Sequence, residues 1–264
     1  MMKENLGLIF HKREELLIPY SHFLVTTEIV EHGCLSSKTT CYLAPLYLYP
    51  EKNNPGKRSP GGLMMLFEPK KDYEVKKPNI SPALIEQLTK DFKKALSPEQ
   101  IFFYIYAVLY SNTYRTKYAE FLKTDFPRIP FTGNYKLFLR MGEHGKRLVD
   151  LHLLKSSELD SPISKLQGKG DSKVEKVKYE KECVYINNDQ CFEGVKTDVW
   201  QYQVGGYQVC DKWLKDRKGR PLSLDEIKNY CKIVTALQKT IDIQKAIDDL
   251  YPGIEKEILD FEQT

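Results

Sequence analysis

Asp72, Glu74 and Lys76 have the side chains that a metal-dependent nuclease gathers around one ion. Their alternate spacing would place all three on the same face of a single strand. Nuclease sites of this kind usually take their carboxylates from separate strands, so the spacing favours solvated charges. A nuclease site remains the weaker alternative to solvated surface charges.

A zinc site is the second chemistry that the residue types suggest, with His32, Cys34 and Cys41 as ligands. The chain has six cysteines, and no two of them have the two to four intervening residues that are typical of a zinc ligand pair. We therefore expect buried free thiols and no bound metal.

The sequence lacks the loops that hold a flipped base, a cofactor or a phosphate chain. Amino-methyltransferases that act on DNA use a Pro-Pro-aromatic loop, and the chain has no Pro-Pro pair. Gly205-Gly206 lacks cofactor-binding spacing, and the segment 142–147 is one-sided and ends in Arg147. A phosphate loop ending at Gly145-Lys146 would need a glycine at position 140, which is Arg140. Serine, cysteine and histidine residues are too scattered to define a triad. We expect no catalytic residue and no cofactor.

Two capping boxes indicate where helices begin. Ser97 and Gln100 open an apolar helix over 97–109, and Ser223 and Glu226 open a long one that ends near residue 250. Other helices are expected over 81–96, 113–122, 137–154 and 207–215.

The long C-terminal helix has an apolar seam, and another helix has a histidine on its apolar face. Ile227, Val234 and Ile241 recur every seven residues, which is typical of a helix packed lengthwise on a partner. That partner is either a neighbouring domain or, more simply, the rest of this chain. His152 is expected to be a hydrogen-bonded core histidine.

Short strands are expected over 6–10, 23–27, 42–49 and 199–204, and a hairpin over 174–179 and 183–186. With the helices they predict an α+β fold with a mixed sheet and a long C-terminal helix. A polar hinge over 156–172 divides the chain into a first part, 1–155, and a second part, 173–264.

Composition limits the class of protein without identifying a partner. The 264 residues are 41% hydrophobic, enough for one sizeable core or two smaller ones. A formal charge of +4 is too small to prove a polyanion partner. No apolar run has the roughly 20 residues of a membrane span, and the N-terminus lacks a signal sequence. We expect a cytoplasmic protein with no membrane partner.

Three stretches together resemble one protein family. They are residues 102–131, which include Tyr114-Arg115 and Asp125-Phe126-Pro127-Arg128-Ile129-Pro130, residues 174–186, and residues 192–224, which include Gly205-Gly206-Tyr207-Gln208-Val209 and Asp211-Lys212-Trp213-Leu214. The pattern resembles the C-terminal specificity domain of type ISP restriction-modification enzymes. In that family one polypeptide joins a nuclease, a helicase-like motor, an adenine methyltransferase and a target recognition domain.

The resemblance implies that this chain selects a sequence in double-stranded DNA while its neighbours do the chemistry. The implied partners are duplex DNA and the methyltransferase and helicase domains of a parent polypeptide, whose catalytic parts would lie upstream. The opening Asn5-Leu6-Gly7-Leu8-Ile9 is similar to the strand that follows the methyltransferase domain in such proteins.

Side chains that contact base edges are expected in irregular polar segments, such as 52–58 and 134–146. Arginine and lysine can pair with guanine, and asparagine and glutamine can pair with adenine. The base-reading candidates are Asn53, Asn54, Lys57, Arg58, Arg140 and Arg147. The phosphate-contacting candidates are Lys52, Arg115, Lys117, Arg128, Lys146, Lys212, Lys215, Arg217, Lys218 and Arg220. For the cations of 212–220, a soluble turn anchored by Trp213 is an equally good interpretation.

Two other functions remain open. One is a degenerate catalytic fragment, either a DNA methyltransferase or a metal-dependent nuclease. The other is a structural module that docks the motor to the methyltransferase.

Overall fold

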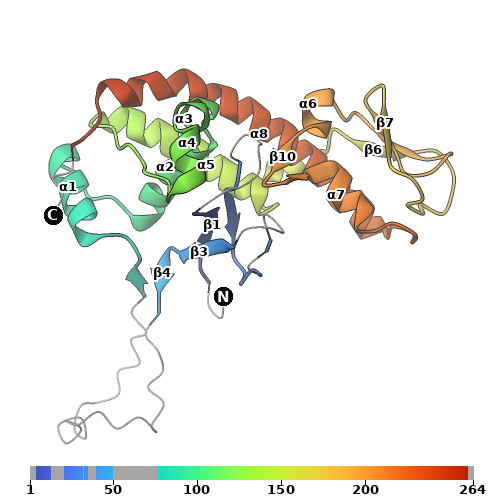
Figure 1. Ribbon diagram of the computed structural model, residues 1–264, viewed down its shortest axis with the longest axis horizontal. Coiled ribbons are helices and arrows are strands. Elements are labelled where there is room, and N and C mark those ends of the chain that lie inside the picture. Colours follow the sequence, from blue (N-terminus) through green and yellow to red (C-terminus); the bar gives the residue numbers. More distant parts are fainter. Residues whose placement is uncertain (1–3, 13–20, 32, 35–39, 50–75, 261–264) are drawn as a thin grey trace, which may run out of the picture.

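The computed structural model describes residues 4–12, 21–31, 33–34, 40–49 and 76–260. These residues form an elongated α+β fold, so the predicted class is confirmed (Figure 1). The helices are α1 (Pro82–Phe92), α2 (Pro98–Tyr110), α3 (Asn112–Lys117), α4 (Ala119–Thr124), α5 (Tyr135–His152), the short 3-10 helix η1 (Ser157–Leu159), α6 (Thr197–Trp200), α7 (Val209–Lys215) and α8 (Leu224–Lys256). The strands are β1 (Gly7–His11), β2 (Leu24–Thr26), β3 (Cys41–Pro45), β4 (Tyr47–Leu48), β5 (Lys77–Pro78), β6 (Lys165–Gln167), β7 (Lys178–Glu180), β8 (Cys183–Tyr185), β9 (Cys191–Glu193), β10 (Gln203–Val204) and β11 (Tyr207–Gln208).

Both predicted capping boxes are present. Gln100 N donates to Ser97 Oγ at 3.2 Å, and Ser97 N donates back to Gln100 Oε1 at 2.9 Å. Ser223 and Glu226 form the same reciprocal pair at the start of α8. These bonds satisfy N–H groups that lack a partner within their helix.

Two of the expected helices differ from their predicted bounds. The helix expected over 113–122 is divided into α3 and α4, because Tyr118 departs from helical geometry. Helix α8 ends at Lys256 rather than near residue 250, with Pro252 inside it.

The strand pairs are antiparallel, so the expectation of a mixed sheet is wrong for the described part of the chain. The larger sheets have the strand orders β2-β1-β3 and β6-β9-β8-β7. Parallel pairing needs a crossover connection of a dozen or more residues, whereas β7, β8 and β9 follow one another through short turns. The predicted hairpin is present as β7 and β8, with Tyr179 opposite Val184.

The strand expected over 199–204 is wrong in its first half, which belongs to α6, while β10 occupies the end of the range. Asp198 lies in the first turn of the short helix, and its carboxylate accepts a hydrogen bond from Val199 N at 2.9 Å. Trp200 then stacks on Tyr179 of β7, with ring centroids 5.2 Å apart. Tertiary packing therefore overrides the strand preference of these residues.

The first hydrophobic cluster lies between the β2-β1-β3 sheet and helices α2, α5 and α8. Helix α2 is buried nearly all round, as its sequence predicts, with Tyr104, Tyr106 and Tyr110 fully enclosed. Helix α5 approaches α2 closely at Gly145, where an added Cβ would lie 1.8 Å from the carbonyl oxygen of Phe103. This contact fixes the spacing of the two helices.

The second cluster lies under the β6-β9-β8-β7 sheet and includes α6, α7 and the first turns of α8. Helix α8 runs from this cluster to the first one, along the length of the molecule (Figure 1). Tyr230, Val234 and Leu237 of the predicted seam are buried in the second cluster, and Ile227 and Ile241 pack against it. The simpler interpretation of the seam, packing on the chain's own core, is confirmed.

The segment expected to be a polar hinge contains regular structure. Residues 157–159 form η1, and β6 pairs with β9 in the second sheet. Helix α8 also brings residues of the range 173–264 into the first cluster. The division into 1–155, 156–172 and 173–264 remains a prediction about folding units.

No helix in the ranges that the structure describes has the length and apolar character needed to cross a bilayer.

Candidate nucleic-acid interface

Part of the predicted interface lies outside the described residues. This applies to the candidates Lys52, Asn53, Asn54, Lys57 and Arg58. It also applies to Asp72, Glu74 and His32 of the alternative metal sites.

Helix α5 holds the described base-reading candidates on its solvent-facing side. The helix expected over 137–154 is present as α5, so the expectation of an irregular segment over 134–146 is wrong from Tyr135 onward. Asn134 caps the helix by accepting a hydrogen bond from Leu137 N at 3.1 Å. Arg140 and Arg147 lie seven residues apart on the same face. Both are exposed. The chain therefore presents these guanidinium groups from a rigid element.

The two arginines of α5 differ in their partners. Arg147 pairs with Glu158 of η1 at 3.2 Å, whereas Arg140 has no ion pair within the described residues. Both charges act on His144 between them, since burial, Arg147 and Arg140 lower the pKa of its imidazole. The neighbouring phosphate candidate, Lys146, pairs with Asp150 at 2.8 Å.

Arg115 points into the protein rather than toward solvent. Its Nε donates to the carbonyl oxygen of Leu109 at 2.6 Å, and its guanidinium lies 4.6 Å from the centre of the Tyr110 ring. An interior arginine held in this way is poorly placed for a phosphate contact.

His152 lies beside this arginine and makes two hydrogen bonds. Its Nδ1 is 2.7 Å from the Tyr106 hydroxyl, and its Nε2 is 2.9 Å from Thr240 Oγ1. Because Thr240 donates its own proton to Ala236 O, Nε2 donates and Nδ1 accepts. The expected core histidine is confirmed.

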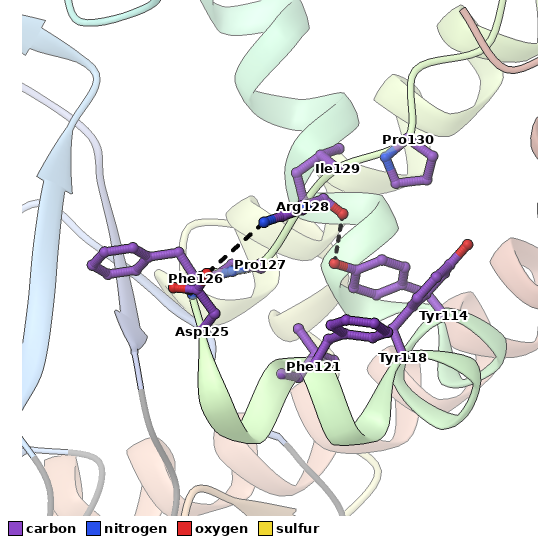
Figure 2. Close-up of a pocket in the computed structure, with 10 residues that line it drawn as sticks. Tyr114, Tyr118, Phe121, Asp125, Phe126, Pro127, Arg128, Ile129 and Pro130 are labelled. Carbon is purple, nitrogen blue, oxygen red and sulfur yellow. Dashed lines mark hydrogen bonds and ion pairs between the residues drawn. The ribbon is translucent and has the colours of Figure 1, made fainter. Parts of the chain in front are cut away.

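A shallow pocket of about 330 Å³ lies where α3, α4 and the segment that follows them meet (Figure 2). Tyr114 donates its hydroxyl proton to the carbonyl oxygen of Arg128 at 2.9 Å, which holds the chain after α4 against α3. The Arg128 side chain is 89% exposed and lies 4.0 Å from Asp125, so its charge faces solvent with one loose partner. Lys117, on α3, instead pairs with Glu255 at 2.7 Å.

The same region exposes aromatic side chains. Phe121 is 69% exposed, and Phe126 is 41% exposed. Phe126 contacts Phe10 and Tyr42 of the first sheet, and Lys12 lies over its ring. Aromatic faces and an exposed guanidinium suit contacts with a base, a phosphate or another protein. They provide no nucleophile.

The cations of 212–220 are mostly paired with carboxylates. Lys212 bonds to Asp216, Lys215 to Asp211 at 2.6 Å, and both Arg217 and Arg220 to Glu226. Hydrogen bonds from Arg220, and further ones from Ser223 and Arg217, lower the pKa of Glu226.

Trp213 holds this turn in place. Arg217 stacks on its ring at 3.5 Å, and the ring in turn contacts Tyr230 of α8. The arrangement favours the anchored-turn interpretation, with Lys218 as the candidate of this turn that has no ion pair among the described residues.

The structure does not bring the described candidates into one patch by direct contact. They lie in three regions: helix α5, the α3–α4 region with the segment that follows it, and α7 with the turn before α8. Sequence reasoning missed the cations of α8, where Lys228, Lys232 and Lys239 share one face. Their spacing of four and seven residues was a signal, but the apolar seam on the adjacent face drew the interpretation toward packing.

Within the described ranges, no three histidine, cysteine or carboxylate side chains gather as ligands. Cys34 and Cys41 have their sulfur atoms 3.3 Å apart, and burial and the neighbouring Cys41 raise the pKa of Cys34 to about 12. The expectation of buried thiols holds for Cys41, Cys210 and Cys231. It is wrong for the exposed Cys34, and Cys183 and Cys191 are only partly buried.

Comparison with known proteins gives one family. The model of the Type ISP C-terminal specificity domain matches residues 1–246. No curated protein matches the chain.

Solved structures with a similar fold include three larger proteins. A nuclease-deletion mutant of the Type ISP restriction-modification enzyme LlaGI, in complex with a DNA substrate mimic, is 18% identical over 92% of this chain and 18% of its own, with a TM-score of 0.60. The ATP-dependent Type ISP restriction-modification enzyme LlaBIII bound to DNA is 18% identical over 93% of this chain and 16% of its own, with a TM-score of 0.66. A DrdV-DNA complex is 21% identical over 92% of this chain and 25% of its own, with a TM-score of 0.68. The chain thus spans a quarter or less of these structures.

Proposed function

Since the chain belongs to the family of Type ISP C-terminal specificity domains, we propose that it recognises a specific sequence in double-stranded DNA as the non-catalytic part of a restriction-modification enzyme. The family match over residues 1–246 is the observation that carries the proposal. The DNA complexes of LlaGI, LlaBIII and DrdV support it, because their similar segments belong to proteins bound to DNA.

The proposal includes a longer parent polypeptide. The similar structures are four or more times longer than the matched segment, which leaves room for the methyltransferase, helicase and nuclease parts that the family resemblance implies. We take those parts as partners of this chain in the cytoplasm. Recognition and chemistry would then lie on separate domains.

Arg140 and Arg147 are the described side chains that we assign to base reading. A guanidinium can donate two hydrogen bonds to the O6 and N7 edge of guanine, and each good pair gives about 1 to 3 kcal/mol of discrimination. Their position on α5 favours this role, because a helix fits the major groove of B-form DNA. Asn53, Asn54, Lys57 and Arg58 remain base-reading proposals on sequence grounds.

Phosphate contacts are assigned to cations that can reach solvent. Arg128 and Lys218 have the least competition from carboxylates of the chain. Lys117, Lys146, Lys212, Lys215, Arg217 and Arg220 would exchange an exposed or partly exposed ion pair for a phosphate, and such pairs contribute only about 0 to 1 kcal/mol. Lys52 stays in this group on sequence grounds.

Selection from a random duplex pool tests the proposal. The chain is mixed with the pool at low salt, bound duplexes are separated by gel retardation, and their sequences are compared with the starting pool. Enrichment of one motif without cleavage or methylation of the DNA supports recognition. Recovery of the pool without enrichment contradicts it.

Titration with a methyl donor separates the catalytic alternative. In a calorimetric titration, a degenerate methyltransferase would bind the donor saturably, whereas a specificity domain should show no saturable binding. Saturable binding would overturn the non-catalytic assignment.

Docking between the parent's motor and methyltransferase is a second candidate function. The exposed Phe121 and Phe126 favour it, because neighbouring exposed aromatic side chains mark protein contacts as well as nucleic-acid contacts. Failure of the chain to bind any duplex at low salt would favour docking alone.

A further inference from the structure

A groove of about 530 Å³ lies between helix α8 and the segment that joins η1 to β6. Its walls come from residues about 60 positions apart in the sequence, which the fold brings together. Leu159, Leu166 and Ile227 give it an apolar lining, and Lys165, Lys228 and Lys232 bring cations to it. We call it the α8 groove.

The walls of the α8 groove are held by specific bonds. Ile163 N donates to Thr235 Oγ1 of α8 at 3.0 Å, and Ser164 Oγ donates to the carbonyl oxygen of Glu193 at 2.7 Å. Strand β6 pairs with β9 immediately afterwards. The groove is therefore fixed before any ligand binds, which lowers the entropy cost of binding.

The cations of the groove exceed the carboxylates that line it. Lys165 and Lys228 are exposed and have no ion pair within the described residues. Lys232 has one loose partner, Asp160, at 3.8 Å. Glu193, opposite Lys165 in the sheet, instead accepts a hydrogen bond from Gln167 at 2.6 Å. Three lysines against Asp160 leave a positive groove.

The cations continue as a line along α8 toward α5. Lys228 and Lys232 are one turn apart, about 6 Å along the helix axis, which is close to two 3.4 Å steps of a DNA strand. Lys239 follows on the same face and shares Glu158 with Arg147, at 3.5 Å and 3.2 Å. The line thus ends at a side chain that we assign to base reading.

We infer that the α8 groove holds the phosphate backbone of duplex DNA, with Lys165, Lys228 and Lys232 as its contacts. This assignment rests on the proposed function, because it takes duplex DNA as the partner. Lysine suits the role, since its ammonium is a compact charge on a flexible stem and needs no fixed geometry. The apolar lining would face the sugars between phosphates.

Salt dependence of DNA binding tests the inference. The full chain, the double variant Lys165→Gln/Lys228→Gln and the matched control Lys245→Gln/Lys256→Gln are titrated against one labelled duplex at several salt concentrations. The control removes the same charge from exposed positions on a different face of α8. All four lysines are exposed and form no ion pair among the described residues, so the substitutions leave the core intact.

In a plot of the logarithm of the binding constant against the logarithm of the salt concentration, each lost phosphate contact should make the slope less steep by about 0.9. The groove variant loses two contacts, so its slope should be less steep by about 1.8. If wild type and the groove variant bind equally at 1 M salt, this difference in slope makes the variant's affinity about 60-fold weaker than that of wild type near 0.1 M salt. The preference for one sequence over another should not change, because phosphate contacts carry no sequence information. The control should keep nearly the wild-type slope.

Two results would overturn the inference and separate it from the proposed function. If wild-type chain binds duplex and the groove variant matches either wild type or the control, the groove is not the contact, and the proposed function still stands. If wild-type chain binds no duplex at low salt, both are wrong.

Discussion

Protonation of His152 is expected to destabilise the fold. Burial and the charge of Arg115 lower the pKa of its imidazole to about 3, against about 6.5 in an unfolded chain. Its Nδ1 accepts from Tyr106, so the folded state needs the neutral ring. A group with a depressed folded pKa favours unfolding once pH falls below its unfolded pKa.

The size of this effect follows from the two pKa values. Near pH 7.5 both states hold a neutral imidazole, and the contribution is close to zero. Near pH 5 the unfolded state gains a proton that the folded state refuses, which removes about 2 kcal/mol from the free energy of unfolding. A full loss of about 4.8 kcal/mol would be reached only below about pH 3.

Urea unfolding of wild type and His152→Gln near pH 7.5 and pH 5 measures the effect. Glutamine can bond to Tyr106 and Thr240 but does not titrate, so the variant should lose about 2 kcal/mol less between the two pH values. His144→Gln is the comparison: burial, Arg147 and Arg140 also lower the pKa of that imidazole, so this variant should reduce the pH dependence as well, but by less than His152→Gln does. Equal pH dependence in wild type and His152→Gln would refute the reasoning.

Three further substitutions test the packing, a helix cap and the α5 interface. Gly145→Ala should destabilise the chain by about 2 kcal/mol or more, because its Cβ would meet Phe103 O, while Gly142→Ala, whose nearest atom is 3.8 Å away, should be neutral or stabilising in urea unfolding; equal stability of the two would contradict the close α2–α5 contact. Ser223→Ala should lower the free energy of unfolding by about 1 kcal/mol through loss of the α8 cap, and an unchanged urea midpoint would count against that cap. Arg140→Gln should weaken DNA binding and change the preferred sequence, whereas Lys146→Gln should weaken it without changing the preference; identical selected motifs for wild type and Arg140→Gln would remove Arg140 from the base-reading set.

Local signals predicted much of the helical part of the fold. Ser97 and Ser223 each begin a helix where their capping boxes indicate, because a cap is set by residues three positions apart. The apolar character of α2 likewise predicts burial on every side. These features depend on neighbours in sequence.

Features set by distant contacts were missed. Helix α6 replaces the first half of an expected strand because Trp200 packs on Tyr179, a contact that no local pattern contains. Strand β6 lies in an expected hinge because its partner β9 is more than 20 residues away. Arg115 was expected at the surface, and its interior position depends on Tyr110 and Leu109.

The candidate interface was the hardest part to predict, since a list of cations does not say which are paired. Arg217 and Arg220 belong to one charged turn in the sequence, yet the fold gives both the same carboxylate, Glu226. Lys165 and Lys228 have no such partner in the described ranges and meet only because β6 lies against α8. Whether a cation is free to contact DNA therefore depends on the tertiary structure.

The most direct test of the central claim is a competition titration between single base-pair variants of the selected duplex and that duplex itself, at one fixed salt concentration. Sequence recognition predicts that changes at read positions weaken binding by about 5- to 150-fold each, as a loss of 1 to 3 kcal/mol requires, while changes outside them do not. Affinities that are the same for every variant would contradict the claim that this chain selects DNA by sequence.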